Sequence, residues 1–363
     1  MAATIDDVAK QSGYSPATIS RVVNGFQGVS PDVRAEVEVA VRKLGYVAKR
    51  ARPTATVQAP PVAQRLVDVV LHRNSSMEEV QVGPGRVSVG PLTTASEGPL
   101  QTLNNDFYRH MLDGIAVELR QHDTSAVLQV VNDLREPSLL ASIGEGSDGV
   151  LLVGEGFPGL EAFIAACRRP LVLVDILDPS CTQEQVTTDN FRGIGQAVDH
   201  LAKLGHRRLG FISGTLVPAT RERAEAFAFH THRHGITVAP EWMEVAYEHI
   251  DRTATSVAAL LSRSARPTGI VCCNDWGALA ALRAAHQAGL RVPQDLSVVG
   301  FDDLPLAAMV TPALTSIRVA IDGLGRMAAR LLLTQKDRPT RGCIVRLPTT
   351  LMVRASTAKP AKD

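Results

Sequence analysis

From residue 65 onward, short apolar runs alternate with amphipathic stretches of helical period, and this alternation constrains the fold more than any other feature of the sequence. The apolar runs of strand length are residues 66–71, 126–131, 149–153, 171–175, 209–213, 269–273, 296–300 and 344–347. The stretches of helical period include residues 107–120, 193–204, 220–234, 276–288 and 321–334. Strands that alternate with helices form parallel sheets covered by helices on both faces. The sequence therefore predicts an α/β domain over residues 65–354.

The first 47 residues, the headpiece, carry a different pattern that predicts three short helices. Thr4 can cap the first helix, with Asp7 three residues later in the position of a capping box. Ser15-Pro16 and Ser30-Pro31 mark two further starts, because serine caps an N-terminus and proline is tolerated at the first helical position. Two short helices joined by a glycine-containing turn and packed by a third have the layout of a helix-turn-helix DNA reader. A small helical bundle without a nucleic-acid role would have the same spacing.

The charge distribution favours a DNA partner at the N-terminus. The 363-residue chain has a formal net charge of only +1, but residues 1–52 hold eight Lys and Arg against five Asp and Glu. This segment therefore carries +3, and the remainder of the chain carries −2. A basic segment suits contact with phosphates. Because +3 is modest, we expect tight binding to double-stranded operator DNA to need two headpieces, and hence a homodimer.

The amino-acid sequence of the headpiece is more specific evidence than the spacing of its predicted helices. Residues 3–46, which include TIDDVAKQSGYSPATISRVVNG and VSPDVRAEVEVAVRKLGY, closely resemble the headpiece of the LacI/GalR family of bacterial transcriptional regulators. The resemblance implies that Pro16, Ala17 and Arg21 face base edges, with Arg21 as the hydrogen-bonding reader of a guanine. The further DNA contacts expected in the headpiece are Thr4, Ser15, Thr18, Ser20 and Asn24.

Residues 48–64 predict a linker that departs from the family pattern. In that family a short hinge folds into a helix on operator DNA and wedges a leucine into the minor groove. Residues 47–61 contain no leucine, and Pro53 and Pro60-Pro61 favour an extended linker over a helix. Three basic residues at its start can lie along phosphates or enter a narrow minor groove, and a solvated charge run is an equally good interpretation. These residues are Lys49, Arg50 and Arg52.

The larger domain also resembles the LacI/GalR family, whose effector domain is similar to a type I periplasmic sugar-binding protein. The stretch RPTGIVCCNDWGALAALRAAHQAGLRVPQDLSVVGFDDLPLAAMVTPALTSIR carries the resemblance most clearly. The implied architecture has two lobes, residues 65–188 with 320–337 and residues 189–319 with 338–354, followed by a flexible tail over 355–363. The implied effector contacts are Phe107, Arg223, Asn274 and Asp302, with Asp189 a weaker candidate.

Polar residues that follow predicted strands support a ligand site, because ligands of α/β sheets bind beyond the carboxyl ends of strands. Asp175 ends one such strand, and three aromatic residues can cover an apolar ring face: Phe107, Tyr108 and Trp276. Carboxylates and amides suit a neutral, hydroxyl-rich ligand such as a sugar or related polyol, and a nucleoside or purine is the alternative. At Asp189 the alternative is a helix cap. The sequence thus predicts a ligand-responsive transcriptional repressor.

Three positions depart from the effector-domain pattern. Ile176 stands where the family commonly has an arginine, which removes one expected sugar donor, and Ala226 replaces a glycine. The largest departure is an insertion of about thirty residues at 73–104, in which alternating residues around a glycine-proline turn predict a β-hairpin. We expect this hairpin to overhang the cleft mouth or to add to the dimer surface.

Other function classes find little support. The chain has no G-x-S-x-G or H-E-x-x-H signature, so we expect no enzyme, no catalytic residue and no cofactor. The five cysteines lack metal-ligand spacing, and His230, His232 and His234 favour a solvated helix end over a metal site. The sequence has no membrane-spanning run and no secretion signal, which predicts a cytoplasmic protein and disfavours a solute-binding transport protein.

Overall fold

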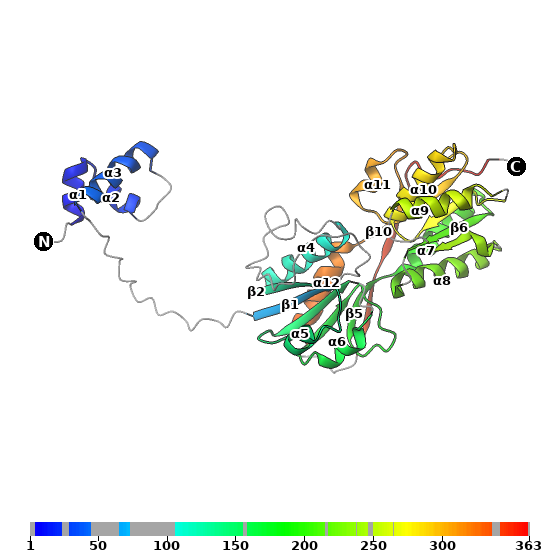
Figure 1. Ribbon diagram of the computed structural model, residues 1–363, viewed down its shortest axis with the longest axis horizontal. Coiled ribbons are helices and arrows are strands. Elements are labelled where there is room, and N and C mark those ends of the chain that lie inside the picture. The colour runs from blue at the N-terminus through cyan, green and yellow to red at the C-terminus, as the bar shows by residue number, and fades with distance from the viewer. Residues whose placement is uncertain are drawn as a thin grey trace. The chain divides into compact units, whose positions relative to one another are not determined.

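The computed structural model divides the chain into two units, Met1–Val62 and Ala63–Asp363 (Figure 1). It describes residues 4–23, 29–44, 65–72, 106–154, 158–214, 217–236, 238–245, 250–263, 265–335 and 342–361. The predicted linker over 48–64, the predicted hairpin over 73–104, and Asn24, Lys49, Arg50 and Arg52 lie outside the described residues. Among the helices of the described residues, none is long and apolar enough to cross a membrane.

The first unit contains the three predicted helices, α1 (Ile5–Ser12), α2 (Pro16–Val23) and α3 (Pro31–Leu44). The predicted capping box is present: the Asp7 backbone N–H donates to Thr4 Oγ1 at 3.3 Å, and the Thr4 backbone N–H donates to Asp7 Oδ2 at 2.8 Å. The three helices share a small core of Val8, Ile19, Val22, Val37 and Ala40. An apolar side of each helix therefore holds this unit together.

The second unit has two lobes, each built on one sheet. The sheet of lobe 1 has the strand order β11-β5-β4-β3-β1-β2, and all its described pairings are parallel. Helices α4 (Asp106–Gln121) and α12 (Ile321–Thr334) pack on one face, and α5 (Pro137–Ser142) and α6 (Leu160–Ala166) pack on the other. The strands are β1 (Arg65–His72), β2 (Thr124–Val131), β3 (Gly149–Gly154), β4 (Leu171–Val174), β5 (Glu184–Thr188) and β11 (Ile344–Leu347).

The sheet of lobe 2 has the order β12-β10-β9-β8-β6-β7 and is parallel except for β12, which pairs antiparallel with β10. Helices α7 (Asn190–Leu204) and α8 (Pro218–Arg233) cover one face, and α9 (Ile250–Leu261) and α10 (Asp275–Gln287) cover the other. A short helix α11 (Pro305–Met309) follows β9. The strands are β6 (Leu209–Ser213), β7 (Met243–Val245), β8 (Gly269–Cys272), β9 (Ser297–Asp302), β10 (Thr315–Val319) and β12 (Thr349–Met352).

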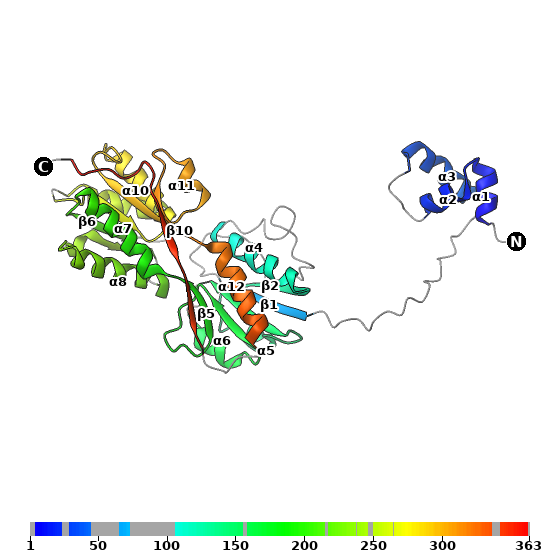
Figure 2. The ribbon, with the colours of Figure 1, turned by 180° about the vertical axis from the view of Figure 1, so that it is seen from behind.

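The chain crosses between the lobes at three places, which Figure 2 shows from behind. The crossings lie between β5 and α7, between β10 and α12, and between β11 and β12. The predicted lobe boundaries after residues 188 and 319 fall at the first two. The prediction that residues 338–354 all belong to lobe 2 is wrong, because β11 pairs with β5 in the lobe 1 sheet. The third crossing is therefore at Pro348.

The C-terminal segment is packed along lobe 2, so the prediction of a flexible tail is wrong for residues 355–361. Ser356 is fully buried, and its Oγ donates to Val298 O at 2.6 Å and accepts from the Thr315 backbone N–H at 2.8 Å. His206 Nε2 donates to Ala358 O at 2.9 Å. These bonds attach the segment to β9 and β10, and sequence polarity alone did not reveal them.

Candidate nucleic-acid interface and ligand pocket

Helix α2 presents the residues predicted to face DNA. Ile19 and Val22 are buried against the other helices, and this leaves Pro16, Ala17 and Arg21 exposed on the helix. Ser20 is half-buried on the same helix. An exposed α2 with one buried side has the form that a recognition helix needs.

Two of the other predicted DNA contacts stabilise helix ends. The Ser15 side chain accepts from the Thr18 backbone N–H at 3.2 Å, and its Oγ lies 2.9 Å from Thr18 Oγ1. Thr4 caps α1 through Asp7. Capping hydroxyls at exposed helix N-termini are also well placed for phosphates, because the N-terminal N–H groups attract anions.

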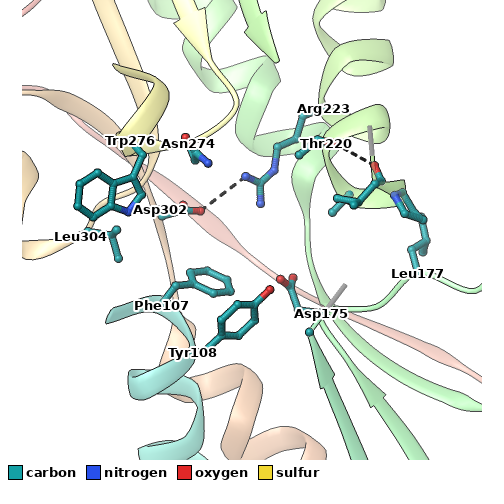
Figure 3. A pocket seen from close by; sticks show the side chains of 14 residues that line it. Phe107, Tyr108, Asp175, Leu177, Thr220, Arg223, Asn274, Trp276, Asp302 and Leu304 are labelled. Carbon is teal, nitrogen blue, oxygen red and sulfur yellow. Dashed lines mark hydrogen bonds and ion pairs between the residues drawn. The ribbon is translucent and has the colours of Figure 1, made fainter. Parts of the chain in front are cut away.

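A pocket lies between the two lobes of the second unit (Figure 3). Its walls come from both lobes, at the carboxyl ends of strands: Asp175 follows β4, Asn274 follows β8, and Asp302 ends β9. The lining residues are Phe107, Tyr108, Gly154, Asp175 and Leu177 from lobe 1 and Val217, Pro218, Ala219, Thr220, Arg223, Asn274, Trp276, Asp302 and Leu304 from lobe 2.

Six of the seven predicted ligand residues line this pocket: Phe107, Tyr108, Asp175, Arg223, Asn274 and Asp302. Asp189 is not in the lining. It caps α7, where its Oδ1 accepts from the Arg192 backbone N–H at 3.1 Å, as in the alternative interpretation of that residue. The lining residues that the sequence did not indicate are Gly154, Leu177, Val217, Pro218, Ala219, Thr220 and Leu304. Helical spacing could have indicated Thr220, because it lies three residues before Arg223 on α8.

Arg223 is held rigidly in the pocket wall. Its side chain is only 6% exposed, Nη1 donates to Cys273 O at 2.5 Å, and Nε donates to Asn190 Oδ1 at 2.8 Å. The guanidinium carbon lies 3.9 Å from the centroid of the Phe301 ring, a cation–π contact. Nη1 also lies 3.6 Å from Asp302 Oδ1, which is an ion pair longer than a hydrogen bond.

Asp302 and Asp175 bring two carboxylates to the lining with hydrogen-bonding capacity to spare. The Oδ1 atom of each is buried and has no hydrogen-bond partner among the described residues. Burial raises the pKa of Asp302 well above its usual value, and the charge of Arg223 opposes this shift. Burial likewise raises the pKa of Asp175 to about 6 against the same opposing charge. An unpaired buried carboxylate oxygen is costly, and a donor on a ligand would satisfy it.

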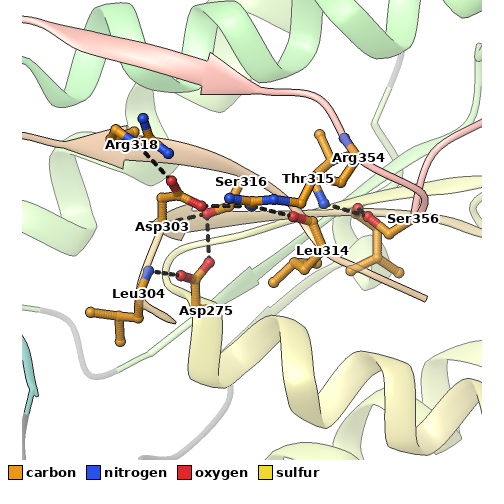
Figure 4. A network of polar contacts seen from close by, with 10 residues as sticks. Asp275, Asp303, Leu304, Leu314, Thr315, Ser316, Arg318, Arg354 and Ser356 are labelled. Atoms are coloured by element: carbon orange, nitrogen blue, oxygen red, sulfur yellow. Dashed lines mark hydrogen bonds and ion pairs between the residues drawn. The ribbon is translucent and has the colours of Figure 1, made fainter. Parts of the chain in front are cut away.

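A polar network behind the pocket ties together the two loops that carry Asn274 and Asp302 (Figure 4). Asp275 Oδ2 accepts from the Leu304 backbone N–H at 2.7 Å, and Oδ1 accepts from Ser316 Oγ at 2.6 Å. Burial raises the pKa of Asp275 to about 7, although these two hydrogen bonds work against the shift. Since Asp275 follows Asn274 directly, its contact to Leu304 fixes one loop against the other.

Asp303 fastens the same loop to the C-terminal part of lobe 2. Its Oδ2 accepts from Arg318 Nε at 2.7 Å, and its Oδ1 lies 2.6 Å from Arg354 Nη1. Arg354 Nη1 also donates to Leu314 O at 2.7 Å. The residue beside the pocket carboxylate is therefore bound by two cations, one on β10 and one just after β12.

The residues that depart from the family pattern lie in the cores. Ile176 is buried in lobe 1 with the α5 and α6 face, and Ala226 is fully buried in the α8 face of lobe 2. Neither lines the pocket. The pocket therefore lacks a donor from position 176, and Arg223 is the cation among its lining residues.

The remaining candidate chemistry is structural. The predicted solvated helix end is wrong for His230, which is buried beside Phe191 and Phe229. His234 Nε2 pairs with Asp199 Oδ1 at 2.5 Å. Within the described ranges, no three His, Cys, Asp or Glu side chains gather as a metal site.

Comparison with known proteins adds a family to this geometry. Residues 4–49 match the bacterial regulatory proteins of the lacI family, and residues 198–357 match a periplasmic binding protein-like domain. The HTH-type transcriptional repressor PurR of Haemophilus influenzae (strain PittEE) is 30% identical over 350 residues, which span 92% of each chain. The ribose operon repressor of Haemophilus influenzae is 27% identical over 342 residues, 93% of each chain.

A solved structure gives the same architecture. The complex of the transcriptional regulator CelR with cellobiose superposes with a TM-score of 0.67 at 27% identity, and the match covers 98% of this chain and 99% of that one. The helix-turn-helix headpiece and the two-lobed α/β body predicted from the sequence are thereby confirmed.

Proposed function

The chain belongs to the LacI family of bacterial regulatory proteins, and from this premise we propose that it is a homodimeric transcriptional repressor whose operator affinity changes when a small hydroxyl-rich molecule binds between its lobes. In this proposal Arg21 reads a guanine, Pro16 and Ala17 contact base edges, and Thr4, Ser15, Thr18 and Ser20 lie near phosphates. Asn24, Lys49, Arg50 and Arg52 stay predicted DNA contacts. A regulator of this kind acts on chromosomal DNA in the cytoplasm.

One observation carries the ligand class: two buried carboxyl oxygens of the lining, Oδ1 of Asp175 and of Asp302, lack a hydrogen-bond partner among the described residues. These oxygens can accept hydrogen bonds, and sugar hydroxyls supply the donors. The guanidinium of Arg223 already contacts Cys273, Asn190 and Asp302, so an anionic ligand would meet two carboxylates and a cation that is already engaged. The site therefore favours a neutral ligand over a phosphate ester.

The aromatic residues of the lining support a sugar or a nucleoside. Phe107 and Tyr108 stand edge to face with ring centroids 5.6 Å apart, and Trp276 lies on the lobe 2 side. Such rings cover the apolar face of a pyranose or a base. The relatives include a ribose operon repressor, and the CelR structure contains cellobiose, so sugars enter the test beside the nucleosides of the alternative prediction.

The regulator proposal is tested by a gel shift of the full chain on duplexes selected from a random pool, with and without D-ribose, cellobiose, adenosine or cytidine. We expect a sequence-specific complex whose amount changes with at least one compound. Failure of the full chain to shift any duplex at low salt would remove the proposal.

The ligand site is tested separately by thermal shift with the same compounds, because a ligand that binds the folded state raises its melting temperature. Asp302→Asn should lower the affinity of a stabilising compound about five-fold or more, since an amide nitrogen replaces a carboxyl oxygen and a lost hydrogen bond costs about 1 kcal/mol. Glu161→Gln, on the exposed side of α6, is the matched control and should leave the shift unchanged. An unaltered shift in Asp302→Asn would exclude this carboxylate from the site.

A further inference from the structure

An ion pair joins the two lobes outside the pocket. Arg346 lies in β11 of lobe 1, Glu222 lies in α8 of lobe 2, and Arg346 Nη1 is 2.6 Å from Glu222 Oε1. The two side chains are 36% and 17% exposed, so the pair is only partly screened by solvent. A movement of one lobe against the other that separates β11 from α8 must break this contact.

The second oxygen of Glu222 connects the pair to the pocket. Glu222 Oε2 accepts from Asn190 Nδ2 at 2.9 Å, and Asn190 Oδ1 accepts from Arg223 Nε at 2.8 Å. Asn190 is fully buried at the start of α7, immediately after the first crossing between the lobes. A continuous series of polar contacts thus runs from Arg346 in lobe 1 to the guanidinium that lines the pocket.

The amide of Asn190 gives this series a definite geometry. Its oxygen faces a cation and its nitrogen faces a carboxylate, so rotation of the amide by half a turn would lose both hydrogen bonds. The backbone at this crossing is also held against β11, because the Asp189 N–H donates to Leu347 O at 2.9 Å. The position of Arg223 in the pocket and the position of β11 are therefore linked through a few buried bonds.

We propose that the Glu222–Arg346 pair is an interlobe latch, which stabilises the lobe arrangement of this structure and is tied to the pocket through Asn190. Resting on the proposed function, the latch gives ligand binding at Arg223 a route to the lobe arrangement. A ligand that shifts the guanidinium loosens or tightens Asn190, and Glu222 transmits the change to β11.

Hydrogen–deuterium exchange of the full chain, without DNA or ligand, tests the latch. In Arg346→Met, peptides that contain the crossings at 188–190, 319–321 and 347–349 should exchange roughly five-fold faster, the effect of losing about 1 kcal/mol. Arg346→Lys, which keeps the charge, should restore most of the protection. The matched control is Arg283→Met, which breaks the 2.6 Å pair with Asp251 inside lobe 2 and should leave the crossings unchanged. Unaltered exchange at the crossings in Arg346→Met would overturn the proposal.

The tie to the pocket is tested by combining variants. Asn190→Ala, and independently Glu222→Gln, should speed exchange at the same crossings, and adding Arg346→Met to either should bring little further change because one series of contacts is already broken. Effects that multiply would mean that Arg346 and Asn190 act separately, which contradicts the proposal. These measurements need no operator and no effector. Their failure would leave the proposed function standing, and a failed gel shift would leave the latch standing.

Discussion

Three aspartates at the pocket end of lobe strands adopt backbone angles that L-residues rarely use. Asp175 has φ 59°, Asp302 has φ 105° and Asp303 has φ 55°. Each such residue costs about 1 kcal/mol or more, and asparagine and aspartate tolerate this region best. At two of the positions the carboxylate lines the pocket (Figure 3), and at the third it binds Arg318 and Arg354. The strain therefore occurs where side chains are presented to the site or hold it in shape.

Arg21 is the residue on which DNA discrimination should depend most. It is exposed on α2, and a guanidinium that pairs with a guanine contributes about 1–3 kcal/mol against the wrong base. We expect Arg21→Ala to lose about 10- to 100-fold in preference for the selected operator over random duplex. Fluorescence anisotropy with both duplexes measures this ratio.

The control for this prediction is Lys43→Ala, which removes an exposed basic side chain from the last turn of α3. Loss of a lysine that contacts only phosphates should weaken binding to all duplexes alike and leave the ratio of the two affinities unchanged. If Arg21→Ala lowered the affinity for both duplexes equally, Arg21 would be a phosphate contact and not a reader of bases.

The raised pKa of Asp175 predicts a pH dependence of stability. Burial raises this pKa from its ordinary value near 4 to about 6, so between these values the folded chain holds a proton that the unfolded chain has lost. The contribution is complete below pH 4 and disappears as the pH rises through about 6, at about 1.4 kcal/mol per pKa unit. The melting temperature of the native chain should therefore fall more steeply between pH 5 and pH 8 than that of Asp175→Asn.

Melting curves of both chains at several pH values between 5 and 8 give this comparison. Histidines and Asp275 contribute to both chains and cancel in the difference, whereas Asp302, whose pKa is raised in part by the charge of Asp175, contributes to the difference with Asp175. Glu161→Gln removes an exposed carboxyl and should follow the native curve. Parallel curves for the native chain and Asp175→Asn would show that the Asp175 carboxyl is better solvated than its position implies.

At the scale of elements, α4 and α12 hold lobe 1 together through a close crossing. A Cβ added at Gly114 in α4 would overlap the carbonyl of Asp322, and one added at Gly325 in α12 would overlap the carbonyl of Met111. Nearby, Arg330 Nε and Nη2 donate to the two oxygens of Glu118 at 2.8 and 3.1 Å. Two glycines thus allow the backbones to approach, and an ion pair fixes the register of the helices.

We expect Gly114→Ala and Gly325→Ala each to destabilise the chain by about 1–3 kcal/mol, because the helices must separate to admit a methyl group. Gly323→Ala is the matched control in α12, since its Cβ would meet only side-chain atoms at 3.3 and 3.4 Å and alanine favours the helix. Thermal or denaturant unfolding compares the three. Equal stability of Gly114→Ala and Gly323→Ala would contradict the close crossing.

Periodicity predicted the strands that are apolar and missed those that are not. Strand β5 has the sequence EQVTT, yet all five residues are buried, because β4 and β11 flank it. Strands β7, β10 and β12 are likewise short or carry polar residues, and tertiary pairing rather than local preference makes them strands. The lobe to which β11 belongs depends on its pairing with a strand about 160 residues earlier, which no local pattern encodes.

The candidate site could be predicted where a residue type and a strand end coincide, as at Asp175, Asn274 and Asp302. The same rule wrongly included Asp189, which caps a helix. A ligand-binding acid and a helix-capping acid both stand just before a helical turn, so the rule cannot tell them apart. The supporting contacts were beyond prediction. Asp303 pairs with Arg354 only because β9, β10 and the C-terminal segment lie side by side. Glu222 pairs with Arg346 only because α8 of lobe 2 lies beside β11 of lobe 1.

At the scale of the whole molecule, the headpiece and the two-lobed unit each have a core of their own. The small core of the headpiece leaves one side of the short helix α2 exposed, and the second unit buries three apolar clusters around its sheets. The modest +3 of residues 1–52 and the eight residues of α2 offer one headpiece few contacts with a duplex. We therefore expect specific affinity to need two headpieces acting together, as in the proposed homodimer.

We expect a duplex with two half-sites to bind at least about 100-fold more tightly than a duplex with one, because the second contact becomes intramolecular. Inserting about five base pairs between the half-sites turns one of them by half a helical turn and should abolish the gain, whereas inserting about ten should restore part of it. Fluorescence anisotropy of the full chain on these four duplexes measures the ratios at fixed salt, which must be held constant since phosphate contacts weaken with ionic strength. Equal affinity for one and two half-sites would mean that each chain reads DNA alone, and the homodimer would then have no part in operator recognition.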